Sequence, residues 1–150
     1  MILIWKQDTL VAYHTKARII NMRDLMGVRL LAGKPLGSSL PRISLLIEGN
    51  SDPADFFYAG PLFVVSDKLR GVIAGTQMEG IEYHALEVRH KGKILCKHNF
   101  YFANICISLD CFDYKKSQYS RDGELIDEIK KLVIDDSKCQ DVNLFRIART

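Results

Sequence analysis

The cysteines and histidines in the middle of the chain are the side chains best suited to chemistry, and thiol catalysis is one possibility. A nucleophilic cysteine needs a base or a positive field beside it, because the thiolate and not the thiol attacks. Cys111 could serve as the nucleophile. The candidates for its base and for an orienting carboxylate are His84, His98, Asp110 and Asp113. No Gly-x-Ser-x-Gly or His-Glu-x-x-His motif supports this reading. A cytosolic thiol enzyme that uses Cys111 is therefore an alternative hypothesis.

The same region suggests metal binding as a second possibility. Its candidate ligands are His84, His90, Cys96, His98, Cys106 and Cys111. Structural zinc sites usually take two ligands from one turn, as in Cys-x-x-Cys or His-x3-His. The sequence contains no such pair, so we expect no metal and no cofactor.

A glycine-containing stretch between Gly27 and Lys34 comes close to a phosphate-binding loop. That loop needs four residues between its glycines and a hydroxyl directly after its lysine. Here five residues separate Gly27 from Gly33, and Pro35 follows Lys34. The stretch therefore predicts a loop without a nucleotide site.

Positive charge is concentrated in the N-terminal third. Residues 1–50 carry seven lysines and arginines against three acids, residues 51–100 six against six, and residues 101–150 eight against nine, which gives a net charge of +3. These charges do not run together, so a scattered, solvated surface explains most of them. The isoelectric point of about 8.7 also lies below the value of about 9 that is typical of a nucleic-acid-binding domain. A nucleic-acid-binding adaptor is thus a second alternative.

Composition indicates one self-sufficient domain. A chain of 150 residues with 47% hydrophobic side chains can bury a core without a disulfide or a metal. No apolar run approaches the ~18–20 residues of a membrane span. The first residues lack the basic region of an export signal. We therefore expect a cytoplasmic protein whose four cysteines are free thiols.

Hydrophobic patterning predicts many short strands and few helices. The segments with a strand pattern are residues 2–5, 10–13, 43–47, 62–65, 81–90, 100–109 and 144–147. Residues 16–32 are predicted to be a helix or an irregular segment, and residues 51–57 a loop. Ser66 is expected to cap a short helix that ends near Gly75. The segments 81–90 and 100–109 should pair as antiparallel strands.

The segment 124–134 fits two structures. Its apolar residues match a helical stripe as well as they match strands. Asp122-Gly123 before it is a strong hairpin turn that would pair residues 117–121 with residues of this segment. We favour strands.

Seven short motifs occur in order along the chain. They are Pro-Ala-Asp-Phe-Phe at 53–57, Leu-Phe-Val-Val-Ser-Asp-Lys-Leu at 62–69, Gly-Ile-Glu-Tyr-His-Ala-Leu-Glu-Val at 80–88, Tyr-Phe-Ala-Asn at 101–104, Leu-Asp-Cys-Phe-Asp-Tyr-Lys-Lys-Ser at 109–117, Lys-Leu-Val-Ile-Asp at 131–135 and Leu-Phe-Arg-Ile at 144–147. Together they resemble the bacterial polymorphic-toxin immunity proteins of the eleventh immunity family. The resemblance spans residues 33–147. We therefore expect residues 1–150 to form a single immunity-protein-like domain, with residues 1–32 as a variable N-terminal part.

The resemblance implies an α+β fold, a single domain built mostly of antiparallel sheet with a few short helices. It also implies a bacterial protein that is no enzyme and that neutralises a cognate secreted toxin by stoichiometric occlusion of its active site. Strands at 124–134 agree with it. The residues themselves suggest structural roles within the motifs: Ser66 as a helix cap, and Asp110, Asp113 and Ser117 as a turn network that fixes a strand exit.

The basic N-terminal third suggests which toxin surface is bound. Inhibitors of nucleases commonly present acidic surfaces, and a positive surface would be repelled by a groove built for nucleic acid. We therefore expect a toxin with an acidic or neutral contact face. Arg18, Arg23 and Arg29 are the candidate contacts, because arginine is enriched at binding hot spots.

Overall fold

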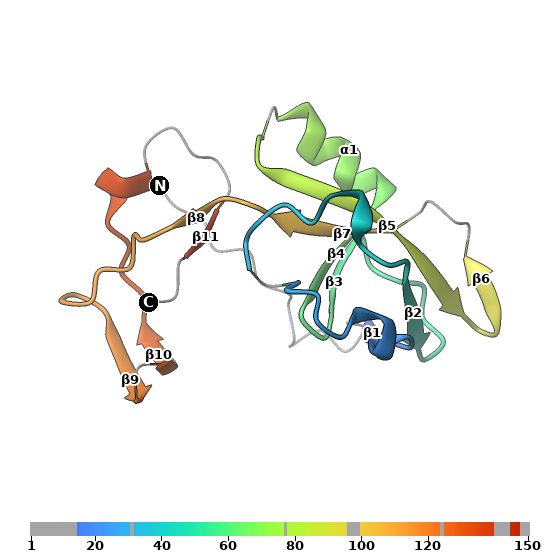
Figure 1. Ribbon diagram of the computed structural model, residues 1–150, viewed down its shortest axis with the longest axis horizontal. Helices are drawn as coiled ribbons and strands as arrows, with labels where there is room; N and C mark the ends of the chain where they lie inside the picture. The colour runs from blue at the N-terminus through green and yellow to red at the C-terminus, as the bar shows by residue number, and fades with distance from the viewer. Residues whose placement is uncertain are drawn as a thin grey trace.

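The computed structural model describes residues 15–30, 32–76, 78–95, 100–123, 125–139 and 145–147 (Figure 1). These residues form two parts that lie side by side. The larger part, up to residue 105, contains a β-barrel and an α-helix. The smaller part, from residue 108 on, contains the remaining strands and is called the C-terminal part below.

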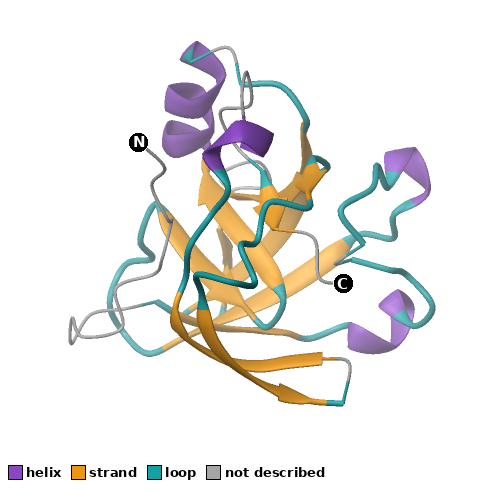
Figure 2. Ribbon diagram, turned by 90° about the vertical axis from the view of Figure 1, so that its left-hand side faces the viewer, coloured by secondary structure: helices purple, strands orange, loops and turns teal. Residues whose placement is uncertain are grey.

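Six strands close into the barrel. They are β1 (Lys16–Ile19), β2 (Ile43–Glu48), β3 (Phe56–Ala59), β4 (Leu62–Ser66), β5 (Ile81–His90) and β7 (Phe100–Ile105). Their order around the wall is β2-β1-β3-β4-β7-β5, and β5 pairs with β2 to complete the ring. The contacts of β1 with β3 and of β2 with β5 are parallel, whereas the other four are antiparallel. Figure 2 shows these strands wrapped around a common interior.

A seventh strand extends one wall of the barrel. β6 (Lys93–Leu95) pairs with the end of β5 as an antiparallel hairpin. The two turn residues, Lys91 and Gly92, both have positive φ angles, of 52° and 75°. A turn of this kind twists in the same sense as the strands it joins.

Inward-pointing side chains fill the barrel because successive residues of a strand face opposite sides. In β2, Ile43, Leu45 and Ile47 are each at most 3% exposed, while Ser44 and Leu46 between them are less buried. Other fully or nearly fully buried members of this core are Phe57, Ala59, Leu62, Val64, Leu86, Val88 and Phe102. Leu25 and Leu30, which lie outside the strands, insert into the same core.

The α-helix covers the outside of the barrel. Helix α1 (Asp67–Gly75) follows β4 directly and packs on β4 and β7 (Figures 1 and 2). Its Ile73 is buried against Val65 and Tyr101 of the barrel wall. The Arg70 guanidinium lies 4.1 Å from the centre of the Tyr101 ring. A second, smaller hydrophobic cluster therefore fixes the helix to the wall.

The C-terminal part is built from two small sheets. Strands β9 (Gln118–Asp122) and β10 (Leu125–Lys131) form an antiparallel hairpin, and β8 (Ser108–Leu109) pairs in parallel with β11 (Arg146–Ile147). Phe112 bridges to Ile134 and is 4% exposed. Its ring lies 4.7 Å from that of Tyr114 and 5.3 Å from that of Tyr119. An aromatic cluster thus forms the centre of this part.

The predicted fold class is wrong. The expectation was an α+β domain of mostly antiparallel sheet with a few short helices, whereas the described residues are mostly β, with a closed barrel and one α-helix. The other helical turns are the short 3₁₀ helices η1 (Met22–Leu25), η2 (Gly37–Ser39) and η3 (Asp136–Cys139). Closure depends on the parallel contact between β2 and β5, which are joined by a long segment, and no local sequence pattern specifies such a contact.

Several predictions at the level of single elements are confirmed. Strands occur at 43–48, 62–66, 81–90 and 100–105, the predicted antiparallel pair is β5 with β7, and α1 starts after Ser66. The segment 124–134 contains strand β10, paired with β9 across the Asp122-Gly123 turn. Two predictions are partly wrong: the loop at 51–57, because β3 starts at Phe56, and the helix or irregular segment at 16–32, because its first residues form strand β1. The strands predicted at 2–5 and 10–13 lie outside the described residues.

None of the helices in the described part of the chain is long and apolar enough to span a membrane.

Candidate partner-binding surface

The thiol of Cys111 is enclosed in the C-terminal part. Cys111 is 0% exposed. Burial, together with the neighbouring Cys139 thiol, raises the pKa of the Cys111 thiol to about 11. His84, one candidate for its base, lies on β5 of the barrel, where its Nε2 is 3.3 Å from Glu82 Oε2. The other candidate, His98, lies outside the described residues. The geometry therefore gives Cys111 no activating partner among the residues that are described.

Asp113 and Ser117 form a turn that directly follows the β-bridge between Phe112 and Ile134. Asp113 Oδ1 accepts hydrogen bonds from the N–H groups of Lys115 and Lys116, each at 3.0 Å. The Ser117 hydroxyl accepts from Val133 N–H at 2.9 Å and lies 3.2 Å from Val133 O, to which it donates. The Lys116 and Lys115 amides lower the pKa of Asp113 despite some desolvation. This arrangement is structural and leaves no group aimed at a ligand.

Asp110 does not take part in that turn. Its carboxylate lies 3.7 Å from the Lys138 ammonium, and both side chains are at least half exposed. A surface pair of this kind contributes little stability. The predicted network therefore divides in the structure into a turn around Asp113 and a separate surface ion pair at Asp110.

Ser66 lies between β4 and α1 and makes contacts on both sides. Its hydroxyl oxygen accepts from Leu69 N–H at 3.1 Å, which satisfies one amide of the first helical turn. The hydroxyl also donates to Asp55 Oδ1 at 2.6 Å, and Lys68 Nζ donates to Asp55 Oδ2 at 3.1 Å. These two hydrogen bonds, the Ser66 one first, lower the pKa of Asp55. Asp55 was not singled out from the sequence, although it lies in the first family-like motif.

Glu82 ties a distant loop to the barrel. Its carboxylate accepts from Leu36 N–H at 2.7 Å, Gly37 N–H at 3.1 Å and Asn104 Nδ2 at 3.1 Å. Asn104, which is 1% exposed, also donates to Lys34 O at 2.9 Å. Partial burial acts to raise the pKa of Glu82, but these hydrogen bonds and the His84 contact outweigh it and lower the pKa to about 2.

Sequence reasoning missed this network. On a strand, Glu82 and His84 share one face, which is a signal for a polar cluster. The loop that Glu82 binds lies 45 and 46 residues away in sequence, so its partners could not be named without the fold.

A shallow groove of about 420 Å³ opens where β2 and β5 separate. Its walls are mostly apolar, and the lining residues are Leu40, Pro41, Arg42, Ile43, Tyr83, His84, Ala85 and Leu86. Two of its polar side chains are already engaged: Arg42 lies 3.1 Å from Glu87, and His84 contacts Glu82. The groove therefore offers apolar contacts to a ligand, whereas its Arg42 side chain is already paired with an acidic residue of the chain.

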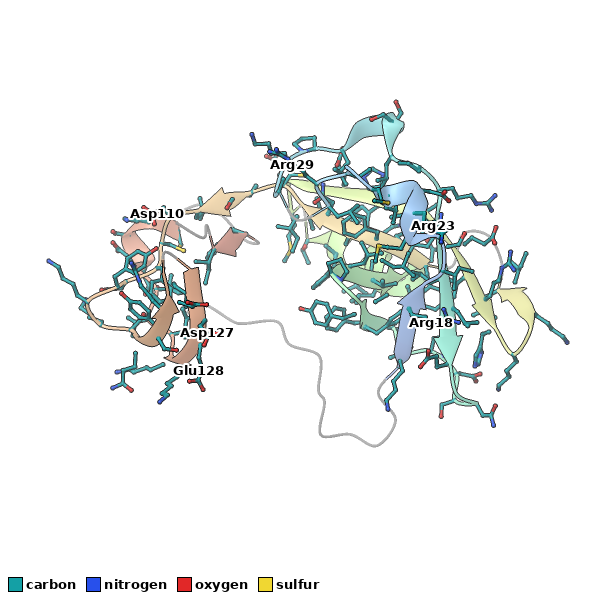
Figure 3. The ribbon with its side chains drawn as sticks, turned by 60° about the horizontal axis from the view of Figure 1, so that its bottom comes forward. Arg18, Arg23, Arg29, Asp110, Asp127 and Glu128 are labelled. Atoms are coloured by element: carbon teal, nitrogen blue, oxygen red, sulfur yellow. The ribbon has the colours of Figure 1, made fainter. Side chains whose placement is uncertain are left out.

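The three arginines predicted to bind the partner all lie on the barrel part (Figure 3). Arg18 is on β1, where its guanidinium lies 3.4 Å from Glu48 and remains 61% exposed. Arg23 is an exposed residue of η1, and Arg29 is exposed in the segment after it. Asp110, Asp127 and Glu128 lie in the C-terminal part, and Arg29 is the one of the three arginines nearest to that part (Figure 3). The three arginines and these three acids therefore belong to different parts of the molecule.

In the described part of the chain, no group of three or more histidine, cysteine or acidic side chains is placed to hold a metal ion. Cys96 and His98, two of the ligands considered above, lie outside that part.

Comparison with known proteins identifies the family. The family model for the "Immunity protein family (Imm11)" matches residues 38–149. This match covers the barrel strands from β2 onward, α1 and the C-terminal part, whereas β1 and η1 precede it. Among curated proteins, none matched the chain. Because the match covers well over half of its length, the chain belongs to the Imm11 immunity protein family.

Proposed function

We propose that this chain is a cytoplasmic immunity protein that binds a cognate secreted toxin and blocks its active site, one chain to one toxin. The observation that carries the proposal is membership of the immunity family over residues 38–149. Proteins with this role protect the cell that makes the toxin, so we infer a bacterial cell that also encodes the toxin.

Occlusion by binding is the mechanism that the described residues support best. The one enclosed thiol considered for catalysis, Cys111, is 0% exposed and has a pKa raised to about 11 by burial. A thiol in that state is a poor nucleophile at neutral pH. Binding requires only a rigid surface, and a standard interface uses about 800 Å² of each partner.

The exposed arginines of the barrel supply that surface with positive charge. Arg18 retains 61% exposure although it is close to Glu48, and Arg23 and Arg29 are exposed as well. Opposite charge across an interface speeds association and disfavours wrong partners. We therefore infer a toxin whose contact face is acidic or neutral. Positive charge would also favour nucleic acid as a direct ligand, but the weak overall basicity argues against that ligand.

Growth rescue tests the proposal. We infer that the gene next to this one encodes the toxin, and its toxin domain is expressed from an inducible promoter, with and without the chain. We expect growth arrest without the chain and normal growth with it. Arrest that persists in the presence of well-expressed, folded chain would overturn the proposed function.

Charge reversal tests the contact face. The triple variant Arg18→Glu, Arg23→Glu, Arg29→Glu should lose affinity for that toxin domain by at least about tenfold, measured by calorimetry at about 0.15 M salt. A control variant changes three other exposed basic residues, Lys91, Lys93 and Lys131, to glutamate and alters the net charge equally. Equal affinities for the two variants would refute the assigned face and leave the toxin-binding role intact.

A further inference from the structure

The segment that follows β1 exposes side chains of the types that are enriched at protein interfaces, methionine and arginine. We call it the methionine loop, residues 20–29, which includes η1. Met26 is 80% exposed and Met22 51% exposed, and Ile20 before them is 38% exposed. Isolated exposed apolar residues are common on protein surfaces. Three such residues lie within seven positions of one segment here, and a concentration of exposed apolar side chains is a feature of interaction sites.

The loop is fixed to the barrel by a side chain in its own sequence. Asn21 Oδ1 accepts from Ser44 N–H at 2.8 Å, and Asn21 Nδ2 donates to Arg42 O at 2.7 Å. The same Nδ2 lies 3.0 Å from Asp24 Oδ2. Ile20 N–H donates to Ser44 O at 2.9 Å. These hydrogen bonds hold the start of the loop against the first residues of β2.

Buried leucines hold the other end of the loop. Leu25 is 4% exposed and Leu30 8% exposed, and both belong to the barrel core. The hydrogen bonds Met26 N–H to Arg23 O, at 3.2 Å, and Val28 N–H to Leu25 O, at 3.0 Å, close the turn between them. The exposed methionines are therefore presented on a backbone that is anchored on both sides. Binding through such a segment costs little ordering entropy.

The charges around the methionines define the chemistry of a partner. The loop carries two exposed basic residues, Arg23 and Arg29, and one acidic residue, Asp24. The carboxylate of Asp24 accepts a hydrogen bond from Asn21. Within the described residues, neither arginine forms an ion pair with the chain itself. Methionine and arginine are both enriched at protein interfaces, and methionine adapts to irregular apolar cavities. A second copy of this chain is a poor occupant, because a two-fold interface would place the same arginines near one another.

We propose that the methionine loop is the anchor of the toxin complex: Met22 and Met26 occupy an apolar cavity of the toxin, and Arg23 and Arg29 pair with carboxylates on its rim. This inference rests on the proposed function and names the contact that carries it. Three residues separate the two methionines, so their Cα atoms lie at most ~15 Å apart. Both thus fit within one interface of about 800 Å². The loop precedes residues 38–149, so the family match does not account for it.

The test uses the full chain and the toxin domain encoded beside it, purified in a catalytically inactive form. The double variant Met22→Glu, Met26→Glu should bind at least about thirtyfold more weakly than the unmodified chain, the loss typical of a hot spot. The conservative double variant Met22→Leu, Met26→Leu should keep its affinity within about threefold. A matched control, Val72→Glu, Ile94→Glu, changes two other exposed apolar residues, 62% and 51% exposed, and should bind as the unmodified chain does. Thermal unfolding of all variants reports whether the fold is retained, which we expect because the changed side chains are exposed.

The outcomes separate this inference from the proposed function. If the unmodified chain binds and the glutamate variant binds equally well, the anchor is elsewhere and only the inference is overturned. An equal loss in the control variant would also overturn it, because the effect would not belong to the loop. If the unmodified chain does not bind the toxin domain, the proposed function itself is overturned.

Discussion

Replacing Glu82 by glutamine should weaken the fold in a pH-dependent way. Leu36 N–H and Gly37 N–H point at the two carboxylate oxygens, at 2.7 and 3.1 Å. Glutamine keeps one oxygen and places an NH₂ group at the other position, where two donors would face each other. The variant also removes the negative charge that these amides and Asn104 stabilise.

The magnitude follows from the pKa of Glu82, which falls from 4.5 to about 2 in the folded chain. At 1.36 kcal/mol per unit, a fall of about 2.5 units corresponds to about 3.4 kcal/mol. The side chain is 27% exposed, and solvent screening reduces the effect, so we expect about 2 kcal/mol at pH 7. A lowered pKa stabilises the fold above pH 4.5, and this contribution disappears as the pH falls toward 2. At pH 3 about 0.8 kcal/mol should remain.

Urea denaturation of the unmodified chain and of Glu82→Gln, at pH 7 and at pH 3, measures this difference. The exposed Glu79 provides the control, since Glu79→Gln should change the free energy of unfolding by no more than about 0.5 kcal/mol. Equal stability of Glu82→Gln and the unmodified chain at pH 7 would refute the reasoning. A deficit of the same size at both pH values would show that charge is not its cause.

Three further changes test other parts of the structure. Ser66→Ala should lower the free energy of unfolding by about 1–2 kcal/mol, because it removes the cap of α1 and the hydrogen bond to Asp55; an unchanged urea midpoint would contradict this. Gly80→Ala should cost about 1–3 kcal/mol, since Gly80 has a φ of 77° and an added Cβ would overlap Ile107; thermal unfolding measures it, and a stabilised variant would disprove the contact. Cys111, 0% exposed and with its pKa raised to about 11, should react with iodoacetamide at about pH 7.5 only after urea unfolding; fast labelling in the folded chain, followed by mass spectrometry, would contradict its enclosure.

Local sequence signals predicted much of the architecture because they act over a few residues. The short apolar run at residues 43–47, bounded by Pro41 and Gly49, identified β2, and Ser66 before Leu69 identified the start of α1. The Asp122-Gly123 turn decided between helix and strand for the segment that became β10. In each case the deciding interaction joins residues close in sequence.

Closure of the barrel could not be predicted in the same way. β2 pairs with β5 from Ile43 and Leu86 onward, and β1 meets β3 through Ala17 and Ala59. These contacts are set by packing of the whole core and not by a turn or a periodicity. The same limit applies to Glu82, whose partners come from a loop far away in sequence.

The candidate surface was predicted in part. The positive charge of residues 1–50 led to the choice of Arg18, Arg23 and Arg29 as candidate contacts. That they contact a toxin is still a prediction. The sequence did not separate the exposed Met22 and Met26 from the buried Leu25, because all three fit an irregular apolar segment. Which of these side chains is exposed and which is buried depends on how Asn21 anchors the loop to the barrel.

The chain is proposed to neutralise its toxin by forming a one-to-one complex. Native mass spectrometry of the purified chain mixed with an excess of the toxin domain encoded beside it tests this most directly. We predict one complex whose mass equals one chain plus one toxin domain. A spectrum that contains only the two free proteins, at concentrations where the toxin arrests growth, would contradict it.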